Sequence, residues 1–180
     1  VLQCTQQTQN LNREKQGPLL VCLGIMSHYL GDLSMPLHNS SNYDGQKSGQ
    51  KGIHSFYESV LVDRLEPSLR QAVLKKARED WAGFSSKKLS PDEWVRWLID
   101  DGFKDVEPLL ALDKKIDRKK IGEAAGSFEP LILKGLSRAA VIVAQVWNSI
   151  LKDVKGWDSK QFYFFDHKPE YIRPKFEDVQ

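Results

Sequence analysis

Cysteine is scarce in this chain. Its 180 residues include only two cysteines, Cys4 and Cys22, too few for the disulfide framework of a small secreted scaffold. One bridge and two free thiols are both compatible with that number. The cysteines therefore leave the redox compartment open.

Long apolar runs are missing too. A membrane-spanning helix needs roughly 18 to 20 consecutive apolar residues, and the longest candidates, PLLVCLGIM at 18–26 and AAVIVA at 139–144, are much shorter. Such stretches are typical of buried helices, so we expect no stable insertion into a membrane. The 26 Lys and Arg nearly balance the 24 Asp and Glu, for a formal net charge of +2. Net charge alone therefore gives no reason to expect binding to nucleic acid or to a membrane surface.

Alternating strand patterns of useful length are also absent, and the pattern that remains is helical. Apolar residues recur at helical spacing in six segments: 16–35, 53–65, 68–81, 90–101, 103–116 and 129–154. The sequence SPDE at 90–93 is a capping signature, and Pro108 predicts a kink or break. We expect one all-α domain over residues 1–180, with 155–180 as an extended aromatic tail laid over the helices.

Three of the four histidines gather in residues 28–59, HYLGDLSMPLHNSSNYDGQKSGQKGIHSFYES. His28 and Asp32 are four residues apart on one predicted helix, and His54 and Glu58 repeat that spacing on the next, which places each pair on one helix face. His38 starts the loop between the two helices. Imidazole nitrogens and carboxylate oxygens without thiolate suit zinc, so these five residues are candidate metal ligands.

A simpler interpretation is that each pair lies on a solvated helix face, since a His with an acid four residues later is common there. Two pairs with a His between them, inside strongly apolar helices where an unpaired ionisable group is costly to bury, favour the metal site instead. The fourth histidine, His167, stands apart, and we expect it to pack at the surface or in the tail.

These residues resemble a known family. HYLGDLSMPLH at 28–38 is similar to the H-x-x-G-D-x-x-x-P-L-H signature of the zinc-dependent phospholipase C and S1/P1 nuclease superfamily, and GIHSFYES at 52–59 resembles the N-L-H-x-x-W-D/E segment that follows it. The resemblance covers about a sixth of the chain. It implies an all-α fold, hydrolysis of phosphodiester bonds with three zinc ions, and a secreted or periplasmic location.

The resemblance also implies a role for each candidate ligand. His38, His54 and Glu58 would hold one zinc ion. His28 and Asp32 would contribute to a neighbouring pair of ions, with Asp32 as the bridging carboxylate and catalytic residue. Asp44, in the loop, is a candidate substrate-binding residue, although nucleases of the family often have Gly-Gly-Asn where this chain continues with Gly45 and Gln46.

The chain departs from the family before this region. In the family an N-terminal Trp binds zinc through its amino group and carbonyl, and upstream helices add further ligands, whereas this chain starts with Val1 and has no histidine before His28. Its first ten residues also show no signal-peptide pattern. We expect either that the N-terminal part of the family domain is not included here or that this branch has lost part of the metal cluster.

Two functions follow as hypotheses. The first is a partial or divergent zinc-dependent phosphodiesterase, whose phosphoester substrate, a lipid headgroup or nucleic acid, is undecided. The second is a non-catalytic helical domain with a structural zinc or a degenerate metal site. The sequence does not indicate an oligomeric state.

Overall fold

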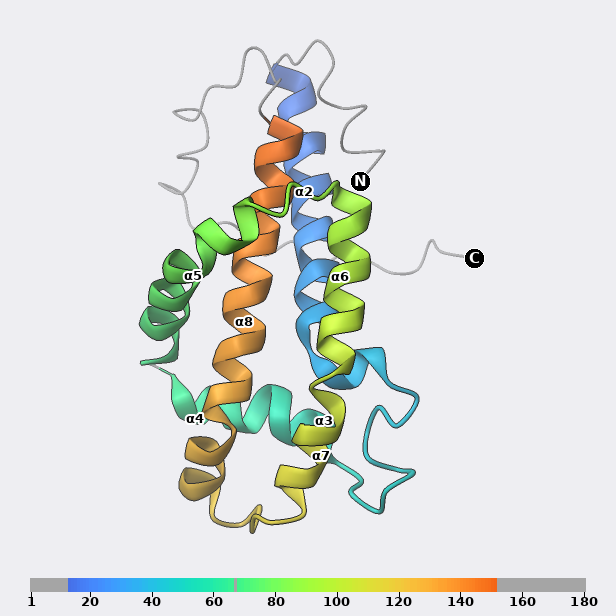
Figure 1. The fold of residues 1–180 in the computed structure, drawn as a ribbon, viewed down its shortest axis with the longest axis vertical. Coiled ribbons are helices and arrows are strands. Elements are labelled where there is room, and N and C mark those ends of the chain that lie inside the picture. The colour runs from blue at the N-terminus through green and yellow to red at the C-terminus, as the bar shows by residue number, and fades with distance from the viewer. Residues whose placement is uncertain (1–12, 67, 152–180) are drawn as a thin grey trace.

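The computed structural model describes residues 13–66 and 68–151, and the regular structure in these ranges is helical (Figure 1). The elements in chain order are α2 (Arg13–Ser34), the 3-10 turn η1 (Pro36–Asn39), α3 (Ile53–Ser55), the π-helical stretch η2 (Phe56–Leu61), α4 (Val62–Leu65), α5 (Leu69–Ser85), α6 (Pro91–Phe103), α7 (Val106–Asp113) and α8 (Ile121–Leu151). The predicted all-α fold is confirmed. The predicted aromatic tail at 155–180, with His167, lies outside the described residues.

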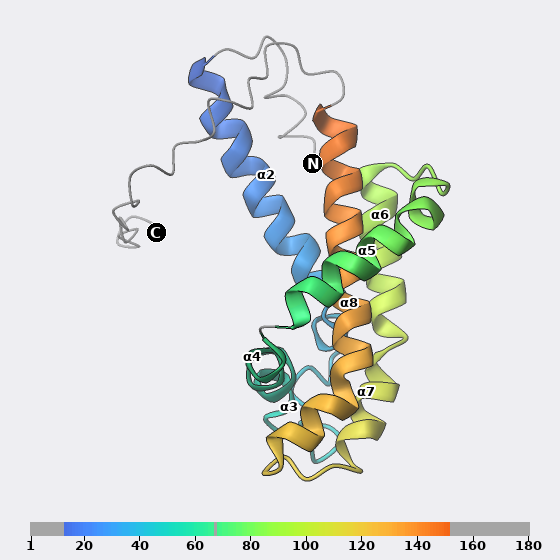
Figure 2. The ribbon, with the colours of Figure 1, turned by 90° about the vertical axis from the view of Figure 1, so that its left-hand side faces the viewer.

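Helix α8 runs through both halves of the core. In one half, buried residues of α2, α6 and α8 pack together, among them Leu23, Leu98 and Ile142. In the other half, η1, α3, η2 and α7 pack around the first turns of α8, with Phe128 fully buried at the contact. The α3, η2 and α4 segments run across the end of α2 rather than alongside it (Figures 1 and 2). The C-terminal end of α2 therefore meets the start of the second predicted helix.

By length and composition alone, α8 is apolar enough to cross a membrane. Its apolar face is nevertheless used inside the fold, because Phe128, Ile142 and Val146 are fully buried there. It also carries the buried Arg138, which pairs with a carboxylate of α6. These contacts are those of a core helix.

Most predicted helices are present with shifted ends. The capping signature is confirmed: Ser90 Oγ accepts from the Glu93 N–H at 3.4 Å, and Glu93 Oε2 accepts from the Ser90 N–H at 2.7 Å. Ser90 Oγ also donates to Glu93 Oε2 at 2.7 Å, and this bond, together with the one from the Ser90 N–H, lowers the pKa of the Glu93 carboxyl. The sequence interpretation missed the first turns of α8, which starts at Ile121 because Ala124, Ala125 and Phe128 extend its buried face.

Pro108 does not kink a helix over 103–116 as expected. That segment is divided: α6 ends at Phe103 and α7 begins at Val106, which places Pro108 in the first turn of α7. An N–H in the first turn of a helix has no partner within the helix, so proline is tolerated there.

A charged cluster ties α8 to α6 and α7. Arg138 is 4% exposed, and its Nη1 lies 2.6 Å from Asp101 Oδ2 while its Nη2 donates to Asp105 Oδ2 at 3.4 Å. Lys134 Nζ donates to the other Asp105 oxygen at 2.7 Å. Asp105 thus neutralises charges from two turns of α8.

Asp105→Ala should lower the free energy of unfolding by about 3 kcal/mol, because it leaves the buried Arg138 charge without one of its partners. Chemical denaturation followed by circular dichroism measures this change. Asp100→Ala, at an exposed position of α6, is the matched control and should change stability by less than about 0.5 kcal/mol. Equal effects of the two substitutions would contradict the role given to Asp105.

Candidate metal centre

His38 is placed by the turn that ends α2. The Asn39 side chain donates from Nδ2 to the carbonyls of Leu33 at 2.8 Å and Met35 at 3.3 Å, so it caps the end of the helix. Helix α6 closes on this turn at Gly102, where a Cβ would lie only 2.6 Å from the Asn39 amide nitrogen and 3.0 Å from the Leu33 carbonyl oxygen. Glycine at position 102 therefore allows α6 to pack directly against the turn that carries His38.

His54 is placed by the loop of residues 40–52. Asp44 Oδ1 accepts from the backbone N–H groups of Gly52 at 3.0 Å and His54 at 3.3 Å, which are free donors at the start of α3. The next residue, Gly45, has φ +71°, and a Cβ there would lie 2.5 Å from the Gln50 carbonyl oxygen. The loop thus needs glycine at 45 in order to fold back and present Asp44 to α3.

Arg118 fastens the same loop to the rest of the fold. Its guanidinium donates to the carbonyls of Gln50 at 2.8 Å and Lys51 at 2.9 Å, and to both carboxylate oxygens of Asp113 at 2.8 and 2.7 Å. The hydrogen bonds to Asp113 raise the pKa of Arg118. Gln50 adds a donor to Asp113 Oδ2 at 2.7 Å, so three side chains hold the end of the loop just before α3.

The two histidines present the same ring nitrogen to each other. Nδ1 of His38 lies 2.9 Å from the Asp32 carbonyl oxygen, and Nδ1 of His54 lies 3.1 Å from the Tyr43 carbonyl oxygen. A carbonyl oxygen only accepts, so we assign the proton of each neutral ring to Nδ1. The Nε2 atoms, 3.2 Å apart, then both carry lone pairs.

Glu58 adds a third acceptor to this pair. Its Oε2 lies 2.9 Å from His54 Nε2 and 3.9 Å from His38 Nε2. Two lone pairs and a carboxylate oxygen facing one another repel unless a cation, a proton or a metal ion, lies among them. Glu58 lies in the π-helical stretch η2, a widened helical turn that is common at functional sites.

The spacing of these three atoms fits a metal ion. Ligand atoms about 2.1 Å from a tetrahedrally coordinated ion lie about 3.4 Å from one another, and the measured separations of 3.2, 2.9 and 3.9 Å surround that value. The exposed fractions are 25% for the His38 side chain, 16% for His54 and 43% for Glu58, so an ion could enter from the Glu58 side. His38, His54 and Glu58 can hold a metal ion.

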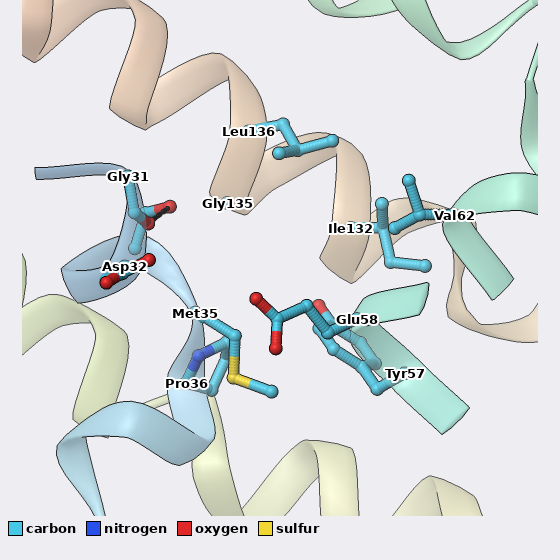
Figure 3. Close-up of a pocket in the computed structure, with 11 residues that line it drawn as sticks. Gly31, Asp32, Met35, Pro36, Tyr57, Glu58, Val62, Ile132, Gly135 and Leu136 are labelled. Atoms are coloured by element: carbon cyan, nitrogen blue, oxygen red, sulfur yellow. Dashed lines mark hydrogen bonds between the residues drawn. The ribbon is translucent and has the colours of Figure 1, made fainter. Parts of the chain in front are cut away.

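The first His-carboxylate pair is placed differently. His28 Nε2 lies 3.4 Å from Asp32 Oδ2, as the four-residue spacing predicts, but the His28 side chain is 71% exposed. Within residues 13–66 and 68–151, the pair is not joined by a third ligand into a metal group. The Asp32 side chain lines a cavity together with Glu58 (Figure 3), and its backbone carbonyl orients His38. Asp32 thus lies on the wall of this cavity, and its partner His28 faces solvent.

The loop residues have roles that the sequence interpretation did not assign. Asp44 is predicted to bind substrate, and in the structure its Oδ1 also accepts hydrogen bonds from backbone N–H groups at the start of α3. The Tyr43 ring also packs on His54, with 4.6 Å between ring centroids. Neither the Tyr43 carbonyl nor the clamp by Arg118 has a signal in the sequence, because one is a backbone group and the other lies more than sixty residues from the loop.

Comparison of the chain with protein-family models, with curated proteins and with solved structures finds no significant match.

Asp44→Ala should weaken metal binding at His38, His54 and Glu58 about tenfold, because groups that orient metal ligands typically contribute 10- to 100-fold to affinity. Titration with Co²⁺, followed by its visible absorption, measures this affinity. Asp44→Asn keeps an Oδ1 acceptor and should restore most of the affinity. If Asp44→Ala bound Co²⁺ as tightly as the unaltered chain, the orienting role of Asp44 would be wrong.

Proposed function

We propose that this chain is a zinc-dependent phosphodiesterase, a partial or divergent relative of the phospholipase C and S1/P1 nuclease type. The convergence of His38 Nε2, His54 Nε2 and Glu58 Oε2 carries the proposal. These are nitrogen and oxygen ligands of the kind zinc prefers, and three of them leave a fourth position of a tetrahedral ion open, as in catalytic zinc sites. The resemblance of residues 28–38 and 52–59 to the family signature supports the same reaction class.

A zinc ion held by these residues would supply Lewis-acid polarisation of a phosphoryl oxygen and activation of water. The chain's own groups would orient the metal ligands and accept a proton. The Asp32 and Tyr43 carbonyls fix the orientation of the two imidazoles, and the Arg118 clamp fixes the loop that carries His54. Asp32, whose side chain is 35% exposed and lines the same cavity as Glu58, would accept a proton from water.

The second candidate function is a helical domain with a structural zinc and no catalysis. One observation favours it: His28 is directed to solvent, so the described residues supply a full ligand set for one ion and not for a second. The two functions share the ligands and differ in whether zinc supports hydrolysis.

Elemental analysis of the chain after zinc reconstitution and removal of loose metal should find close to one zinc per chain. His54→Ala should reduce this to near zero, since it removes the ligand shared by the two shortest contacts. His28→Ala is the matched control and should leave the zinc content unchanged, because His28 lies outside the ligand group. Failure of the unaltered chain to retain zinc at neutral pH would rule out both candidate functions.

The zinc-loaded chain should hydrolyse bis(4-nitrophenyl) phosphate slowly. The two-metal mechanism needs two ions about 3.5 to 4 Å apart, and the described residues supply a full ligand set for only one ion. Asp32→Asn should reduce this rate about 100-fold, the typical loss when a general base is removed. Asp100→Asn should leave it unchanged, and a chelator should abolish it. Zinc binding without any chelator-sensitive hydrolysis would favour the structural role.

A further inference from the structure

A cavity of about 290 Å³ adjoins the metal centre. It lies between the end of α2, the η2 and α4 turns and the middle of α8 (Figure 3). Glu58 belongs both to the cavity wall and to the group that can hold a metal ion. A molecule held at the ion therefore has this cavity beside it.

Most of the cavity wall is apolar. The side chains that line it include those of Met35, Pro36, Val62, Ile132 and Leu136. Leu136 is 37% exposed although it is a leucine in the middle of a core helix, so it offers apolar surface that no described neighbour covers fully. An apolar cavity of about 150 Å³ is known to hold benzene, which means that this one has room for a ring.

The charges of the polar side chains in the cavity wall determine which ligand groups the cavity favours. Asp32 and Glu58 bring two carboxylates to the cavity, and the lining contributed by residues 13–66 and 68–151 contains no Lys or Arg. Tyr57, which carries a hydroxyl, also lines the cavity. The cavity therefore repels a second phosphate and offers few donors to a sugar, whereas it matches a neutral apolar group.

We propose that the cavity lined by Ile132, Leu136, Val62 and Met35 binds the apolar group of a phosphoester whose phosphate lies at the metal centre. The substrate class is thus an aryl or alkyl phosphoester rather than a polyanionic nucleic acid. This inference rests on the proposed function, because it needs a metal ion at His38, His54 and Glu58 to hold the phosphate. It assigns Leu136 and Ile132, which lie on α8 far from the metal ligands in sequence, to substrate selection.

Calorimetric titration of the zinc-loaded chain with three probes tests this: inorganic phosphate, ribose 5-phosphate and phenyl phosphate. Phenyl phosphate should bind about tenfold more tightly than the other two, since burial of one face of the ring contributes at least the 1.4 kcal/mol that tenfold requires. Leu136→Gln should reduce this preference to about twofold. Leu74→Gln, at an exposed leucine of α5 that does not line the cavity, should leave it at about tenfold.

The outcomes separate the two proposals. Zinc binding with equal affinities for the three probes, or with ribose 5-phosphate equal to phenyl phosphate, would overturn the apolar pocket and leave the proposed function standing. A preference for phenyl phosphate that Leu136→Gln does not reduce would also overturn the assignment to this cavity. Absence of zinc binding, measured first by the same calorimetry, would overturn the proposed function and this inference with it.

Discussion

Two backbone carbonyls, those of Asp32 and Tyr43, determine which nitrogens of His38 and His54 face each other. Each carbonyl lies within 3.1 Å of an Nδ1 atom and accepts a hydrogen bond from its N–H. The Nε2 lone pairs are left pointing into the space beside Glu58. Three acceptors within 4 Å are unfavourable without a cation, and this constraint gives the site its chemistry.

The rest of the fold holds those carbonyls in place. The Asp32 carbonyl lies near the C-terminal end of α2, where Asn39 caps the helix and Gly102 lets α6 approach. The Tyr43 carbonyl lies in a loop that Gly45 folds back and Arg118 fastens to Asp113. Helix α8 connects the two regions through a core it shares with both. Because each carbonyl depends on a different clamp, the geometry of the centre depends on tertiary contacts along most of the chain.

The sequence was sufficient to find the three residues that can hold a metal ion. His54 and Glu58 follow from the four-residue helical spacing, and His38 from its place at the start of the loop. The sequence could not reveal that His28 turns to solvent, because spacing on a helix fixes the face relative to Asp32 but not the direction of that face in the fold. The groups that position the histidines could not be found from the sequence either. Every residue has a backbone carbonyl, so nothing marks that of Tyr43, and Arg118 reaches the loop only after the chain has folded.

The first turns of α8 were missed because glycine and charged residues interrupt the apolar pattern around Ala124 and Ala125.

The central claim is that His38, His54 and Glu58 bind one metal ion through Nε2, Nε2 and a carboxylate oxygen. Anomalous diffraction at the zinc absorption edge, from crystals of the zinc-loaded chain, tests it most directly. We expect one strong peak about 2.0 to 2.1 Å from Nε2 of both histidines and about 2.0 to 2.2 Å from a Glu58 oxygen, with each Nδ1 still directed at its carbonyl. A peak on Nδ1 of either histidine, or zinc bound at His28 and Asp32 with none at the three ligands, would contradict it.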